Sequence, residues 1–101
     1  EKWVEVCCTT PARMFGMYPR KGIVSPGADA DLVIYDPNGR TTIGVETHHM
    51  RMDYSAYEGM TVDGHVDTVI SRGTIVVDHG EYLGRAGHGR FVRRDLSQNL
   101  V

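Results

Sequence analysis

The sequence lacks the features that define several classes of protein. None of its apolar runs approaches the roughly 20 residues of a membrane-spanning helix, and its first residues show no signal-peptide pattern. Its 13 acidic and 11 basic residues give a net charge of −2, so there is no basic surplus for nucleic acid or anionic membranes. The two cysteines, Cys7 and Cys8, are adjacent and form neither an ordinary structural disulfide nor a CxxC site. We therefore expect a cytoplasmic protein that binds neither nucleic acid nor membranes.

The spacings that metal sites and catalytic centres require are also missing. The five histidines form no HxH, HExxH or Cys/His zinc pattern: they are His48, His49, His65, His79 and His88. Asp29 and Asp31 do not belong to a calcium-loop pattern, and we expect them to order a turn by accepting backbone N–H bonds. No serine or cysteine lies in a nucleophile-elbow context. We therefore predict no catalytic, cofactor-binding or metal-binding residue in this chain.

One stretch, Arg20 to Pro37, organises what is present. Pro26-Gly27 predicts a turn, because proline fixes φ and glycine accepts a positive φ. The apolar run Leu32–Tyr35 predicts a strand, and Asp36-Pro37 is expected to end it because proline donates no ladder hydrogen bond. Since this strand is apolar on both faces, both faces need cover.

The residues before that stretch predict two short helical pieces. One buried face of the first piece is predicted from four residues at helical spacing: Trp3, Val4, Cys7 and Cys8. Thr9-Thr10-Pro11 is expected to interrupt the helix, with Thr10 as N-cap and Pro11 at the first position of the second piece. Gly16 is the expected C-cap.

The remaining strands are predicted from turn signals. Asn38-Gly39 predicts a hairpin that returns through residues 40–43, and residues 45–50 fit a further strand. Residues 52–60 are expected to form an ordered loop, and 62–66 fit either a short strand or a connection. Residues 68–72 and 74–77 flank Gly73 and predict two strands joined by a tight bend, followed by a turn at 78–80. From Gly84 onward an extended tail is expected, ordered only where it packs.

Three segments of the sequence resemble a known family. These are TTPARMFGMYPRKG, GADADLVIYDP and ETHHMRMDYSAYEGM, and the tail GRAGHGRFVRR is similar to the family as well. Together they resemble the C-terminal end of hydantoinases and dihydropyrimidinases, cyclic-amide hydrolases of the amidohydrolase superfamily. The G-x-D-A-D-L-V-I segment is shared by many amidohydrolases, whereas HHM-x-x-DYS-x-YEGM is typical of the hydantoinase branch. The resemblance extends from about Val4 to Arg94.

That resemblance implies a (β/α)₈ barrel with two divalent metals, usually zinc, bridged by a carboxylated lysine. It also implies a β-sandwich built from both ends of a longer chain, and a homotetramer whose tails pack on neighbouring subunits. No position of this sequence matches a metal ligand or substrate-positioning residue of the family, so no catalytic residue is carried over.

We therefore expect a mainly β fold with one or two N-terminal helical segments, the C-terminal part of a composite β-sandwich that flanks a (β/α)₈ barrel. Residues 1–18 are predicted to end the barrel's helical region, 19–83 to form the sandwich portion, and 84–101 the tail. The chain, which begins at Glu1, is expected to be a processed or excised part of a longer enzyme, inactive alone. Its expected partners are the missing barrel portion and further copies, bound through edge strands and tail. The alternative is a stand-alone, non-enzymatic β-rich interaction module derived from the same family.

Overall fold

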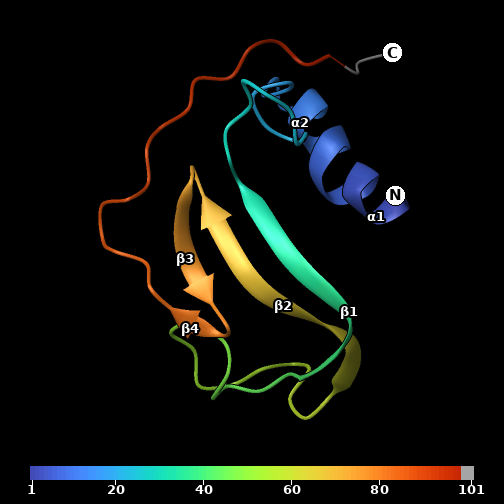
Figure 1. Ribbon diagram of the computed structural model, residues 1–101, viewed down its shortest axis with the longest axis vertical. Coiled ribbons are helices and arrows are strands. Elements are labelled where there is room, and N and C mark those ends of the chain that lie inside the picture. The colour runs from blue at the N-terminus through green and yellow to red at the C-terminus, as the bar shows by residue number, and fades with distance from the viewer. Residues whose placement is uncertain (99–101) are drawn as a thin grey trace. The chain divides into compact units, whose positions relative to one another are not determined.

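The computed structural model describes residues 1–98, which are arranged as a helical segment followed by an antiparallel sheet (Figure 1). The chain divides into two compact units. One contains Glu1–Asp31 and residues 86–98, and the other is Leu32–Arg85. The predicted mainly β fold with a helical N-terminal segment is thereby confirmed. None of the helices within residues 1–98 is long and apolar enough to cross a membrane.

The helical segment is continuous, and the predicted interruption at Thr9-Thr10-Pro11 is wrong. It consists of α1 (Lys2–Val4), a π-helical turn η1 (Glu5–Thr9) and α2 (Thr10–Met14). Proline has no N–H and its ring clashes with the carbonyl four residues earlier in an α-helix. The wider turn accommodates Pro11, and the Thr10 N–H reaches back five residues to the carbonyl of Glu5. The helix ends at Phe15, and Gly16 takes φ +66°, the cap conformation that the sequence predicts.

The predicted buried face of this helix is also wrong for this chain. Trp3 is 60% exposed and Val4 53% exposed, and both cysteines are exposed. Within its own unit the helix meets loops and the tail rather than a second helix or a sheet. Ala12 is the one buried apolar side chain among the residues described. It lies beside Gly22, where an added Cβ would come within 2.5 Å of the Ala12 Cβ.

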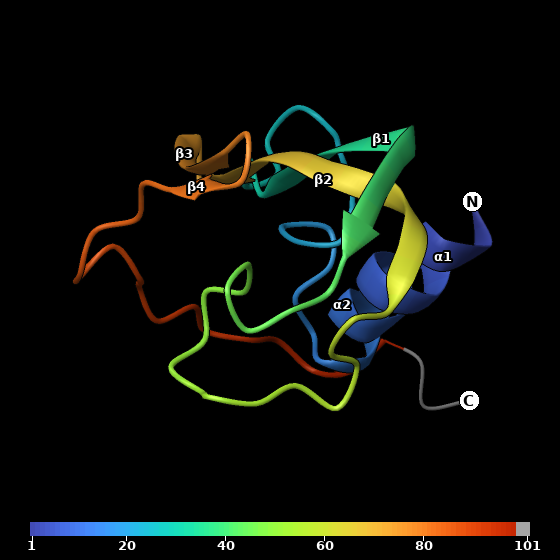
Figure 2. The same cartoon turned by 90° about the horizontal axis from the view of Figure 1, so that it is seen from below.

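The second unit is a four-stranded antiparallel sheet in the order β1-β2-β3-β4 (Figures 1 and 2). Its strands are β1 (Leu32–Thr42), β2 (Thr61–Ser71), β3 (Thr74–Asp78) and β4 (Glu81–Tyr82). Arg72-Gly73 joins β2 to β3 with φ values of +46° and +78°. His79-Gly80 joins β3 to β4 with +46° and +81°, so both are the two-residue hairpin turns with positive φ that suit the twist of paired strands. The bend at Gly73 and the turn at 78–80 are therefore confirmed.

Two local predictions in this unit are wrong. β1 continues past Asp36-Pro37, and Asn38-Gly39 is not a hairpin but part of an irregularity within β1, which resumes pairing at Arg40 opposite Asp63. The Asn38 N–H donates to the Asp36 carboxylate at 2.9 Å, so the turn-forming residues bend the strand instead of reversing it.

Residues 45–50 form no strand, which corrects that prediction: 45–47 are a turn and 48–50 are irregular. The N–H groups of Thr47 and His48 both donate to the carbonyl of Gly44. This local bonding uses the N–H groups that a strand would have offered to a neighbour.

Candidate functional site

Both faces of β1 are exposed, which makes this strand the strongest candidate for an interaction surface. Side chains alternate between faces along a strand, so Val33 and Ile34 point to opposite sides of the sheet. Val33 is 57% exposed and Ile34 53% exposed. The sequence predicts that this strand needs cover on both faces. The described residues do not provide that cover.

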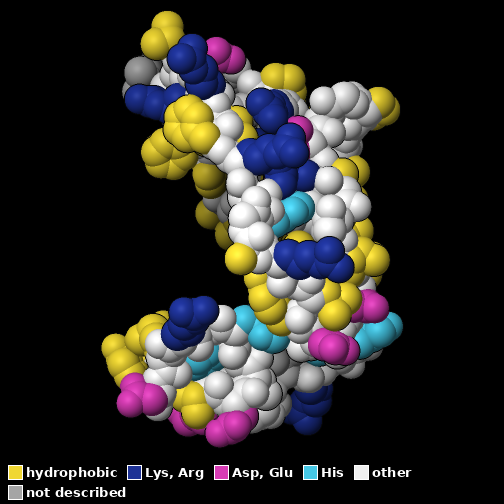
Figure 3. All heavy atoms as spheres, turned by 90° about the vertical axis from the view of Figure 1, so that its left-hand side faces the viewer, with side chains coloured by type: hydrophobic (Ala, Val, Ile, Leu, Met, Phe, Trp, Pro, Cys, Tyr) yellow, Lys and Arg dark blue, Asp and Glu magenta, His cyan; other side chains and the backbone are white. Residues whose placement is uncertain are grey.

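Apolar exposure continues over the rest of the sheet. Its other exposed apolar residues include Tyr35, Val62, Val66, Ile75 and Tyr82. Figure 3 shows hydrophobic side chains at the surface, interspersed with charged groups. Soluble monomers rarely expose so many large apolar side chains on one small sheet.

The backbone of β1 is a second open feature. β1 lies at one end of the strand order, and within residues 1–98 it pairs on one side only, with β2. It is eleven residues long, whereas β4 at the opposite end has two. A long edge strand presents unpaired N–H and C=O groups and is a template for another strand.

The total accessible surface supports the same interpretation. The chain exposes 8339 Å². Two separate compact bodies sharing its 11.2 kDa equally would together expose about 6,900 Å². The excess of about 1,400 Å² is more than one partner buries in an interface of standard size, about 800 Å².

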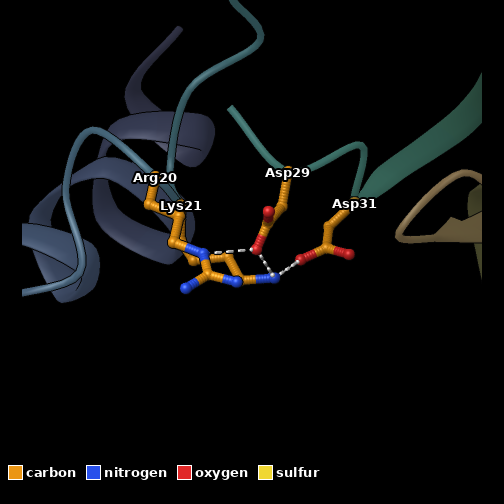
Figure 4. Close-up of polar contacts among 4 residues, drawn as sticks. All are labelled: Arg20, Lys21, Asp29 and Asp31. Atoms are coloured by element: carbon orange, nitrogen blue, oxygen red, sulfur yellow. Dashed lines mark hydrogen bonds and ion pairs between the residues drawn. The ribbon is translucent and has the colours of Figure 1, made fainter. Parts of the chain in front are cut away.

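A charged cluster closes the loop that precedes β1 (Figure 4). Arg20 Nε lies 3.0 Å from the Asp29 carboxylate, and Lys21 Nζ lies 2.9 Å from the same oxygen and also pairs with Asp31. Hydrogen bonds from Lys21 and Arg20 outweigh desolvation and lower the pKa of Asp29 below its ordinary value of 3.8. Burial tends to lower the pKa of Lys21, but its bonds to Asp31 and Asp29 outweigh that effect and raise it above 10.5.

This cluster corrects the expected role of the two aspartates. Both carboxylates hold cationic side chains across the loop, a role that the turn signal alone did not indicate. The turn itself is confirmed: Gly27 takes φ +91°, and the Ala28 N–H donates to the Ser25 carbonyl at 3.1 Å. The cluster is an intramolecular clamp with all its charges paired, so it stabilises the approach to β1 rather than offering a ligand site.

The histidines lie in separate local contacts. His79 Nδ1 lies 2.6 Å from an Asp67 carboxylate oxygen, and the His49 ring lies 5.5 Å from that of Tyr82. The Met50 N–H donates to His48 Nδ1 at 3.1 Å. Within residues 1–98, no three histidine, cysteine, aspartate or glutamate side chains gather closely enough to hold a metal ion.

The tail makes contacts that sequence reasoning missed. The Asp95 N–H donates to the Gly16 carbonyl at 2.8 Å, and the Gln98 N–H donates to the Arg13 carbonyl at 3.0 Å. A Cβ at Gly16 would lie 2.0 Å from the Asp95 carbonyl oxygen. Because these are backbone contacts between distant segments, no residue pattern could have indicated them.

The chain is similar to known proteins over almost its whole length. It is 57% identical over 100 residues to the D-hydantoinase of Streptomyces coelicolor. This alignment covers 99% of this chain and 21% of that protein. The dihydropyrimidinase of Brevibacillus agri superposes with a TM-score of 0.88 at 47% identity, over 95% of this chain and 21% of that structure. The L-hydantoinase (dihydropyrimidinase) of Arthrobacter aurescens superposes with a TM-score of 0.84 at 42% identity. The superposition covers 90% of this chain and 20% of that structure.

These relatives confirm the resemblance found in the sequence, and they show that it covers only part of each relative. The chain spans about a fifth of the length of each relative. Residues 1–76 match the amidohydrolase family. The chain therefore belongs to the amidohydrolase family and is homologous to its hydantoinases and dihydropyrimidinases.

Proposed function

We propose that this chain is the C-terminal part of a hydantoinase- or dihydropyrimidinase-type enzyme, and that its contribution to that enzyme is structural. The parent would hydrolyse a cyclic amide in the cytoplasm. The observation that carries this proposal is the uncovered β1, with Val33 and Ile34 more than half exposed on opposite faces, in a chain that spans a fifth of its relatives.

The reactive centre belongs, on this proposal, to the rest of the parent. Amidohydrolases are generally metal-dependent, but the described residues offer no group of three metal ligands and so do not fit a metal centre. The two divalent metals and the carboxylated lysine that the resemblance implies would be held by the barrel. No catalytic step is assigned to a residue of this chain.

The proposed partners are the missing barrel portion and further copies of the enzyme. β1 offers an unpaired edge and two apolar faces to the missing barrel portion. In the tail, Phe91 is 90% exposed and Leu96 89% exposed, as expected of side chains that pack on another subunit.

Two measurements on the purified 101-residue chain test the proposal. A hydantoin-hydrolysis assay with added zinc should show no turnover, and clear activity would contradict the structural role. Light scattering should show self-association, because the uncovered apolar faces leave water by pairing with other copies. A stable, monodisperse monomer would contradict the open-sheet interpretation.

A matched pair of variants locates the surface responsible. Val33→Lys places a charge on the open sheet and should shift the chain towards monomer. Val24→Lys makes the same change at an 82% exposed valine outside the sheet and should leave self-association unchanged. Equal effects of the two substitutions would show that general solubility, not the sheet, controls association.

A further inference from the structure

Two adjacent thiols lie exposed in the helical segment. Cys7 and Cys8 are both free and exposed. Neighbouring Cα atoms across a trans peptide are about 3.8 Å apart, whereas ordinary disulfides need about 4.4 Å or more. The two thiols are thus not consumed by bonding to each other, and no other cysteine is present in the chain.

The π-helical turn brings these side chains closer in direction. Both cysteines lie inside η1, whose hydrogen bond runs from the Thr10 N–H to the Glu5 carbonyl. A π-helix closes its hydrogen bonds over five residues instead of four, so adjacent side chains diverge by less than the roughly 100° of an α-helix. Pro11, which has no N–H to donate to an α-helical hydrogen bond, lies at the start of α2 directly after this turn.

Two neighbouring sulfurs on one turn select a particular class of ligand. Sulfur is a soft donor that prefers soft acceptors. A four-coordinate structural zinc needs further protein ligands, and the described residues provide no third one here. A trivalent arsenical with one organic substituent needs only two sulfurs, so the pair can satisfy it completely.

We propose that Cys7 and Cys8 form a dithiol site that chelates a mono-organic trivalent arsenical. Two As–S bonds form and the As–O bond of the arsenoxide breaks. The two thiol protons leave with that oxygen as water, and no atom changes oxidation state. This inference does not depend on the proposed function. Because the site lies on the exposed helix, its reactivity also reports whether that helix is uncovered.

The test uses phenylarsine oxide with the 101-residue chain, in excess glutathione to remove arsenic held by a single thiol. We expect one arsenic per chain by mass spectrometry and loss of both titratable thiols, reversed by 2,3-dimercaptopropanol. Cys7→Ser and Cys8→Ser should each weaken retention at least tenfold. Val6→Ser, a change of similar kind at a 55% exposed residue of the same turn, should retain arsenic fully.

Far-UV circular dichroism separates native from unfolded binding. The helical signal should persist at saturation. Loss of that signal on binding, arsenic retained by either serine variant, or no retention by the unsubstituted chain would each overturn the proposal. None of these results depends on hydantoin hydrolysis or self-association, so the two proposals fail separately.

Discussion

Replacing Gly64 with alanine should destabilise the sheet through a single, identifiable clash. Gly64 lies in β2 with φ +102°, beside the ring of Tyr35 in β1. An added Cβ would lie 1.6 Å from the Tyr35 Oη and 2.4 Å from Cζ. The tyrosine ring would therefore have to leave its place, and its hydrogen bond to the Asp63 carbonyl at 3.3 Å would be lost.

The magnitude follows from two separate costs. A non-glycine residue at positive φ costs about 1–2 kcal/mol. Loss of a hydrogen bond adds about 0.5–1.5 kcal/mol. We expect Gly64→Ala to lower the free energy of unfolding by the sum of the two, about 1.5–3.5 kcal/mol. Gly73→Ala is the matched control, because Gly73 has φ +78° and an added Cβ would meet no atom within 4 Å. It should show the backbone cost alone.

Urea unfolding followed by far-UV circular dichroism measures both variants. The midpoint should fall for each, and further for Gly64→Ala. In a Tyr35→Ala background the difference between the two glycine substitutions should disappear, since the ring that clashes is gone. Equal midpoints for the two variants in the unsubstituted background would refute the close packing of Tyr35 on Gly64.

Three further predictions concern the loop clamp, the hairpin and the helix. Asp29→Asn should destabilise the chain near neutral pH and reduce its acid sensitivity in urea titrations. The pairing with Lys21 lowers the pKa of Asp29, so its contribution is present above pH 3.8 and disappears as pH falls through the folded-state value. Asp67→Asn should likewise reduce the loss of unfolding free energy as the pH falls, because hydrogen bonds from Thr68 and then His79 lower the pKa of Asp67. An unchanged acid dependence of the unfolding free energy would contradict this. Gly22→Ala should lower the thermal midpoint more than Gly27→Ala. An added Cβ at Gly22 would lie 2.8 Å from the Cys8 carbonyl oxygen, whereas one at Gly27 would meet nothing within 4 Å. Equal shifts of the thermal midpoint would exclude the contact at Gly22.

Local turn chemistry was readable from the sequence because neighbouring residues determine it. Pro26-Gly27, the bend at Gly73 and the turn at 78–80 need particular φ values that few residues accept, so their residue types identify them. The family was readable for a related reason, since its motifs are continuous stretches of sequence.

Where distant residues compete with a local signal, the local prediction failed. Asn38-Gly39 favours a hairpin by itself, but pairing of Arg40–Thr42 with Thr61–Asp63 keeps β1 in one piece. Pro11 favours a helix break, yet a wider turn accommodates it, as the Thr10-to-Glu5 hydrogen bond shows.

By itself, the sequence determined the mainly β composition, the turns and the resemblance to hydantoinases, because each depends on residues that lie close together along the chain. Only the tertiary structure decided that Val33 and Ile34 are both exposed, that β1 is a long open edge, and that the two cysteines share a π-helical turn. Burial and strand pairing depend on which other segments are near, and that is a property of the folded arrangement rather than of any one stretch.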